Sequence, residues 1–171
     1  RLLPDGKTDP TFDPGAGPNR AVFKMVRQAD GSVLVAGIFT AVGGSERPGI
    51  ARLLSNGTLD ASYQPALLQP PTVGVYTMGQ QADGKLLVGG VFSSVAGHEV
   101  PGLARLNAVG TFDSSFLPSP TLLNVSRIAI QPDGRIVLGG WSIPGGLSSF
   151  GGITRVLGGP YEFRFTSIHR A

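Results

Sequence analysis

Cysteine is absent from this chain, so disulfides and thiolate chemistry are both excluded. Charged residues make up only 15% of the sequence, and the net charge of +3 reflects a low number of acids rather than clustered bases. The 14 lysines and arginines are scattered singly, which is unlike the basic stripe of a nucleic-acid-binding protein. No apolar run approaches the roughly 20 residues that cross a bilayer as a helix. The composition therefore predicts no nucleic-acid partner and no membrane span.

Glycine and proline are abundant instead, with 26 and 14 residues. The glycines recur at fixed places between apolar runs, which is typical of turns and strand crossings rather than of disorder. Hydrophobic residues make up 41% of the chain, which favours a folded domain. No segment keeps the i, i+3, i+4, i+7 apolar spacing of an amphipathic helix, so the pattern indicates an all-β fold.

The chain repeats itself with a period of about 50 residues. The segment Arg52–Pro65 returns as Arg105–Pro118, and an opening copy lies at Arg1–Pro14. A second shared block occurs at Gln28–Gly37, Gln81–Gly90 and Gln131–Gly140. The distance from the Asp of this block to the next apolar strand is 20 residues in every copy, so length varies between units rather than within them. Such a period indicates one supersecondary unit that is copied and stacked.

Each unit contains short apolar runs of strand length that are separated by turns. The expected first strands are 21–28, 73–81 and 125–131, the second 32–39, 85–92 and 135–141, and the third 50–54, 103–107 and 153–157. A weaker fourth strand is expected at 59–63 and 112–116. Four short antiparallel strands in a unit of about 50 residues form one blade of a β-propeller.

The sequence therefore predicts an all-β fold of β-propeller blades, each of four antiparallel strands, in an incomplete ring. We expect residues 1–20 to be the tail of a preceding repeat and residues 21–72 and 73–124 to be two blades. Residues 125–171 are expected to form a degenerate terminal blade. Closed propellers need about 4 to 8 blades, so we expect further blades from the same or another chain.

Three blocks of the sequence, Gln131–Gly140, Gly102–Asn107 and Gly110–Phe116, resemble a known repeat in their residues, order and spacing. They look like the delta-60 repeat, a bacterial β-propeller repeat whose role is largely undefined. The resemblance covers nearly the whole chain. It implies a secreted or cell-surface protein with no assigned catalytic residue. The third copy departs from the pattern, because Trp141-Ser142 replaces the Ile-Phe and Val-Phe pairs of the other copies.

An Asp-Gly pair occurs at the same place in every copy and is expected to form the turn between the first two strands. Paired carboxylates can also bind calcium or act in acid–base catalysis. Equal positions in successive blades, however, lie around a ring rather than in one cleft. We therefore predict turn residues and no catalytic role, and we leave a weak calcium site open. The pairs are Asp30-Gly31, Asp83-Gly84 and Asp133-Gly134.

An arginine precedes an aspartate by eight residues in three places. We expect each Arg on a third strand to pair with the Asp near the fourth strand and to fix the turn between them by a charge-assisted hydrogen bond. The pairs are Arg1 with Asp9, Arg52 with Asp60, and Arg105 with Asp113. Arg155 has no equivalent partner, because position 163 is Phe.

The loops at 40–49, 93–102 and 143–152 differ most between the copies and are expected on one rim of the blades. Variable loops on a rigid frame are where binding usually resides. The candidate ligand-binding residues there are Glu46, Arg47, His98, Glu99 and Trp141. For Trp141 a core position equivalent to Ile38 and Val91 is the alternative. Neither histidine has the clustered partners of a zinc site, so no metal or cofactor is expected.

We predict a non-enzymatic extracellular module that binds protein or glycan, or serves as a scaffold, through these rim loops. Two alternatives stay open. The chain could be an accessory part of a carbohydrate-active enzyme whose catalytic residues lie outside this sequence. It could also be a structural element whose exposed blade edges pair between chains.

Overall fold

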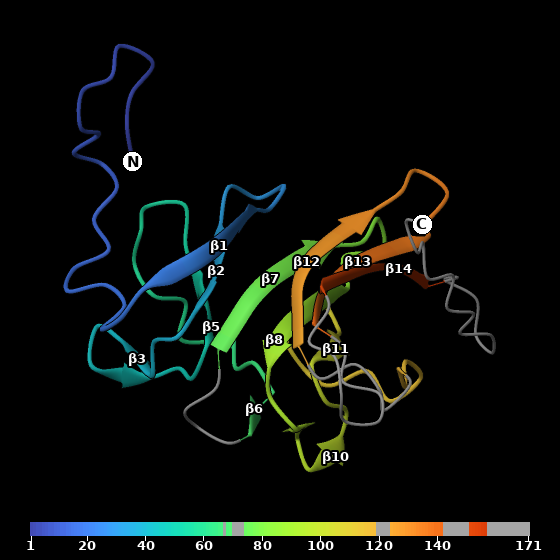
Figure 1. The fold of residues 1–171 in the computed structure, drawn as a ribbon. Helices are drawn as coiled ribbons and strands as arrows, with labels where there is room; N and C mark the ends of the chain where they lie inside the picture. The colour runs from blue at the N-terminus through green and yellow to red at the C-terminus, as the bar shows by residue number, and fades with distance from the viewer. Residues whose placement is uncertain (67, 70–73, 119–123, 142–150, 157–171) are drawn as a thin grey trace.

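The chain folds entirely into β-strands and turns (Figure 1). The computed structural model describes residues 1–66, 68–69, 74–118, 124–141 and 151–156, and for positions 69, 141 and 151–156 it describes the backbone alone. Within these ranges there is no helix, and hence none that is long and apolar enough to cross a bilayer.

Three antiparallel sheets of three strands form successive blades along the chain. In each blade the second strand lies between the first and the third and pairs with both. Blade 1 consists of β1 (Val22–Arg27), β2 (Val33–Gly37) and β5 (Ile50–Leu53). Blade 2 consists of β7 (Gly74–Gln80), β8 (Leu86–Val91) and β11 (Leu103–Leu106). Blade 3 consists of β12 (Asn124–Ile130), β13 (Ile136–Trp141) and β14 (Gly151–Val156).

The expected fourth strand is present only as a single antiparallel bridge in blades 1 and 2, Leu53 with Leu59 and Leu106 with Phe112. Just after the first bridge, the Asp60 carboxylate accepts the backbone N–H of Ser62 at 2.9 Å. A side chain that takes a nearby N–H competes with the sheet ladder. The segment therefore turns away after one bridge instead of continuing as a strand.

Small hairpins occupy two of the segments that the sequence presents as loops. Strands β3 (Ala41–Val42) and β4 (Ser45–Glu46) pair in blade 1, and β9 (Ser94–Val95) and β10 (His98–Glu99) pair in blade 2. The short strand β6 (Leu68–Gln69) adds to β9. We refer to the β3–β4 and β9–β10 hairpins as the rim hairpins. Their short turns fix the backbone of the variable segments more tightly than a loop would.

Neighbouring blades pack face to face through apolar side chains. One core cluster joins Leu34 of blade 1 to Val75 and Met78 of blade 2. A second cluster joins Leu87 of blade 2 to Val125 of blade 3. Because the second strands carry apolar residues toward both faces, each blade can contribute to a core on either side.

The face of blade 1 that points away from blade 2 is only partly covered. Phe12 of the segment 1–20 packs against a cluster on this face. Val22 and Met25 on β1 nevertheless remain 37% and 65% exposed, whereas the equivalent Val75 and Met78 on β7 are 0% and 1% exposed. The preceding blade therefore accounts for the burial of these two positions in blade 2.

Candidate functional site

The Asp-Gly pairs form the turns between the first and second strands. Each glycine has a positive φ, between 80° and 84°, which favours glycine over other residues. Each aspartate accepts the backbone N–H two residues later, at 2.9–3.0 Å. Hydrogen bonds from Ser32 lower the pKa of Asp30, and the backbone N–H of Arg135 leads the causes that lower the pKa of Asp133. These carboxylates therefore serve their own turns.

Each of the three predicted Arg–Asp pairs is within hydrogen-bond distance. The Arg Nε donates to an Asp Oδ2 at 2.7–2.8 Å, from Arg1 to Asp9, from Arg52 to Asp60 and from Arg105 to Asp113. The other oxygen of each carboxylate accepts the N–H and the hydroxyl of the Thr or Ser two residues later. All three aspartates are 6–7% exposed. Each pair thus ties a third strand to the turn that follows it.

Two further contacts complete this unit, and the sequence reading did not include them. Each guanidinium lies 4.6–5.2 Å from the centre of an aromatic ring three residues after the aspartate, Phe12, Tyr63 or Phe116. In blade 2 the ammonium of Lys85 also reaches Asp113, at 2.8 Å. The recurrence of an aromatic residue at the third position after each Asp was the available signal for the first contact. Burial raises the pKa of Tyr63 to about 12, so its hydroxyl stays protonated.

Hydrogen bonds keep these carboxylates ionised. The hydroxyl and backbone N–H of Thr11, together with Arg1, lower the pKa of Asp9 to about 2. The Ser62 hydroxyl is the main cause of the lowered pKa of Asp60. Burial raises the pKa of Asp113, but the hydrogen bonds from Lys85, Ser115 and Arg105 outweigh that effect and lower it. A carboxylate that is permanently ionised and hydrogen-bonded is a poor proton donor or acceptor at neutral pH.

The repeated aspartates do not come together. They lie in different turns, and across the part of the chain that the structure describes, no three His, Asp or Glu side chains gather as a metal-ion site. The arrangement supplies structural ion pairs and turn caps, and no shared carboxylate centre is formed there.

The predicted ligand-binding residues are found on or beside the rim hairpins. Glu46 lies on β4, and His98 and Glu99 lie on β10, all three exposed. The His98 ring stacks on Phe112 with 4.7 Å between centroids. Arg47 is half-buried, and its Nη1 donates to the Glu46 carbonyl at 2.7 Å. The rim hairpins therefore present mixed charges on a fixed backbone.

The third predicted rim loop lies largely outside the described residues, which omit 142–150. Trp141 ends β13, where its backbone pairs with Asn124 and Gly151, and its side chain is likewise outside the description. The equivalent Val91 is 43% exposed. The core position that the sequence offered as an alternative for Trp141 is therefore not a core position in blade 2.

A different feature, a β-bulge, recurs on the first strand of every blade. The register shifts between Val22 and Lys24, between Val75 and Thr77, and between Val125 and Arg127. Each shift leaves one extra residue in the strand, namely Phe23, Tyr76 or Ser126. A bulge re-aims side chains at the edge of a sheet, so these positions turn away from the regular alternation.

The partner strand permits each bulge by carrying glycine. A Cβ on Gly37, Gly90 or Gly140 would lie 2.0 Å from a carbonyl oxygen at the start of the first strand, which no side chain allows. The Gly-Gly pairs of the second strands thus have a defined task at their second position. In blade 1 the first position is Ala36, which shows that the second glycine is the required one.

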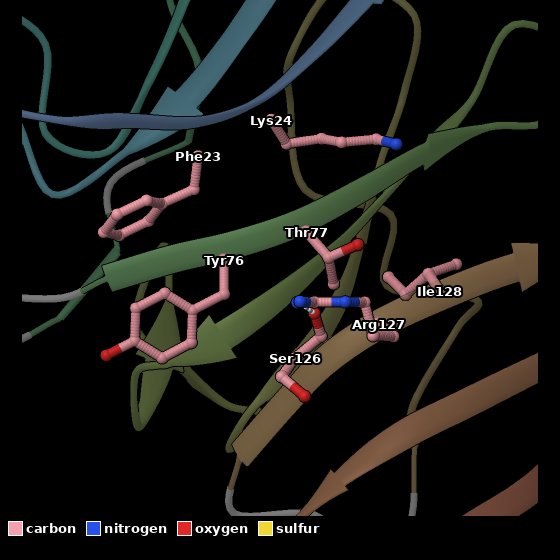
Figure 2. Close-up of a pocket in the computed structure, with 7 residues that line it drawn as sticks. All are labelled: Phe23, Lys24, Tyr76, Thr77, Ser126, Arg127 and Ile128. Carbon is pink, nitrogen blue, oxygen red and sulfur yellow. Dashed lines mark hydrogen bonds between the residues drawn. The ribbon is translucent and has the colours of Figure 1, made fainter.

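The bulged strands β1, β7 and β12 lie at free edges of their sheets, and β7 contacts both of the others. Side chains beside the bulges line a groove of about 560 Å³ that crosses all three blades (Figure 2). We call it the inner-strand groove. It is lined by Phe23, Lys24, Tyr76, Thr77, Ser126, Arg127 and Ile128.

The inner-strand groove combines an aromatic end with two cations. The rings of Phe23 and Tyr76 meet edge to face with 5.5 Å between centroids, and Lys24 and Arg127 lie farther along the groove (Figure 2). No Asp or Glu occurs on any of the three strands. The sequence reading missed this site, because a bulge cannot be read from alternation; the polar residue at the same place in each first strand was the available signal.

Successive antiparallel blades, each with the same bulge and the same Arg–Asp turn, define a β-propeller repeat protein. The model of one protein family, "Domain of unknown function (DUF5122) beta-propeller", matches residues 28–63, 81–116 and 131–156, which is more than half of the chain. The chain belongs to this family. The narrower delta-60 name stays a prediction. No curated protein matches the chain.

Proposed function

We propose that this chain is a non-enzymatic interaction module, secreted or displayed at the cell surface, that binds protein or glycan through its rim hairpins. One observation carries the proposal. The polar residues that repeat between copies bind one another, whereas the polar residues that differ between copies are exposed on the rim hairpins. A frame with fixed internal contacts and variable exposed hairpins is the usual design of a binding scaffold.

The chemistry of the repeated acids supports a non-catalytic role. A general acid or base must reach a substrate and exchange a proton near neutral pH. Asp9, Asp60 and Asp113 are buried in separate turns, and their hydrogen bonds lower their pKa values. Their partners are the third strand and the turn itself, so the energy of these contacts goes into the frame.

Binding and turnover measured on the same samples test the proposal. We expect the chain to bind at least one extracellular protein or polysaccharide on an array without hydrolysing it. The variant Glu46→Ala/His98→Ala/Glu99→Ala should weaken that binding by about tenfold or more, because exposed residues at the centre of an interface dominate its affinity. Its melting temperature should stay within about 2 °C of wild type, since exposed substitutions change stability little.

The matched control is Asp5→Ala/Lys7→Ala, which removes an exposed ion pair from the tail segment. This control should bind as the wild type does. Release of reducing ends from a polysaccharide by the purified chain would contradict the proposal. So would binding that survives the rim substitutions unchanged.

A further inference from the structure

We propose that the inner-strand groove is a second binding site and that it takes an anionic oligosaccharide, whose sugar ring carries a carboxylate or a sulfate. The site shares no residue with the rim hairpins and extends beyond the function proposed for them. Its volume of about 560 Å³ lies within the range of small-ligand sites.

The first argument is uncompensated positive charge. Lys24 and Arg127 are both exposed, and over the described ranges neither is in an ion pair with a carboxylate. Arg127 Nη1 donates to the carbonyl of Ser126 at 2.6 Å, which holds the guanidinium beside the bulge. The groove has two cations and no acidic lining residue, so an anionic ligand would supply the missing counter-charge.

The second argument is the aromatic end of the groove. Phe23 is 49% exposed although it is a large apolar residue, and Tyr76 beside it is half-exposed. The edge-to-face pair offers a rigid apolar surface next to the hydroxyls of Thr77 and Ser126. A pyranose ring has an apolar face of C–H groups and a rim of hydroxyls, and this combination of surfaces fits both.

The direction of the groove favours a sugar over an acidic peptide. An extended peptide binds a sheet edge by pairing along one strand. This groove crosses three strands and receives only two or three side chains from each, so no single edge offers a continuous ladder. A nucleic acid is disfavoured because two cations neutralise too few phosphates for firm binding.

Calorimetric titration of the whole chain with a galacturonic acid tetramer tests the proposal. Its methyl ester serves as the neutral counterpart, and a chondroitin sulfate tetramer serves as the sulfated probe. We expect binding of an acidic tetramer and little or none of the ester. The variant Lys24→Gln/Arg127→Gln should lower the affinity roughly 10- to 100-fold, because it removes two charge-assisted contacts.

Two further variants separate charge from packing. Phe23→Ala should lower the affinity roughly 3- to 10-fold through loss of the aromatic surface. Lys7→Gln/Arg135→Gln removes the same charge outside the groove and should stay within about twofold of wild type. The rim variant Glu46→Ala/His98→Ala/Glu99→Ala should keep this affinity, so loss of rim binding and loss of groove binding are independent results.

Every outcome bears on the groove. Binding of the uronic acid alone, or of the sulfated probe alone, supports the proposal and identifies the anion. Equal binding of the methyl ester would show that charge has no part and would overturn it. Hexaglutamate or a single-stranded oligonucleotide bound more tightly than either sugar, with the same sensitivity to Lys24→Gln/Arg127→Gln, would assign the groove to a peptide or to nucleic acid instead. Absence of binding to both acidic sugars would also overturn it.

Discussion

Replacing Asp113 with alanine should lower the free energy of unfolding by about 2–3 kcal/mol, because the substitution leaves two cations without their counter-ion. Asp113 is 6% exposed and accepts hydrogen bonds from Arg105 at 2.7 Å, from Lys85 at 2.8 Å and from Ser115. The two cations keep some contact with water, which places the effect below that of a fully buried pair. Urea denaturation measures the change as a lower midpoint.

Asp83→Ala is the matched control for Asp113→Ala. Asp83 is exposed and accepts a single backbone hydrogen bond, from Lys85. Its loss should cost about 1 kcal/mol or less. If Asp113→Ala unfolded at the wild-type urea concentration, the Arg–Asp turn would have no part in holding the blade together.

Gly90→Ala should destabilise the chain by about 3 kcal/mol, because the new methyl group has no space and must displace backbone. The added Cβ would lie 2.0 Å from the carbonyl oxygen of Gly74. That carbonyl belongs to the first residue of β7, directly before the bulge at Tyr76. The bulge would have to open, which would disturb the pairing of β7 with β8 and the groove above it. Thermal and urea unfolding both report the loss.

The control for Gly90→Ala is the same substitution at Gly139, the first position of a Gly-Gly pair. A Cβ at Gly139 would meet only the Arg127 side chain, at 3.4 Å, which is ordinary contact. Gly139→Ala should therefore change stability by less than about 1 kcal/mol. Equal effects of the two substitutions would mean that the bulge does not depend on a missing side chain.

The strands and the blade repeat are predictable from the sequence because they depend on local patterns. Apolar runs bounded by Asp-Gly turns give the three main strands of each blade nearly to the residue. The Arg–Asp spacing is also readable, since eight residues span a third strand's end and the short turn that follows it. The contact between Lys85 and Asp113 is not, because these residues are 28 positions apart and meet only when the sheet forms.

Local competition explains the features that the sequence misplaced. The expected fourth strand ends after one bridge because Asp60 and Asp113 take the backbone N–H groups that a strand would use. The rim hairpin β9–β10 turns through Ala96 with φ of 50°, a conformation that alanine does not signal. The inner-strand groove needs three bulges in register, and that register is a property of the stacked blades rather than of one strand.

The low pKa values predict how the frame responds to acid. A carboxyl whose pKa is lowered on folding stabilises the folded state above its unfolded pKa, which is about 3.9, and loses that contribution as the pH falls toward the folded value. For Asp9 the folded value is about 2. The contribution of the Arg–Asp turns should therefore be complete at neutral pH and should fall away between about pH 4 and pH 2.

A titration of the aspartate carboxyl carbons by NMR tests the central claim most directly, because that claim assigns the repeated acids to the frame. Asp9, Asp60 and Asp113 should remain ionised well below the ordinary pKa of 3.8. Titration of all three near 3.8 would contradict the account, since the carboxylates would then be free of the arginine and hydroxyl contacts that define each blade.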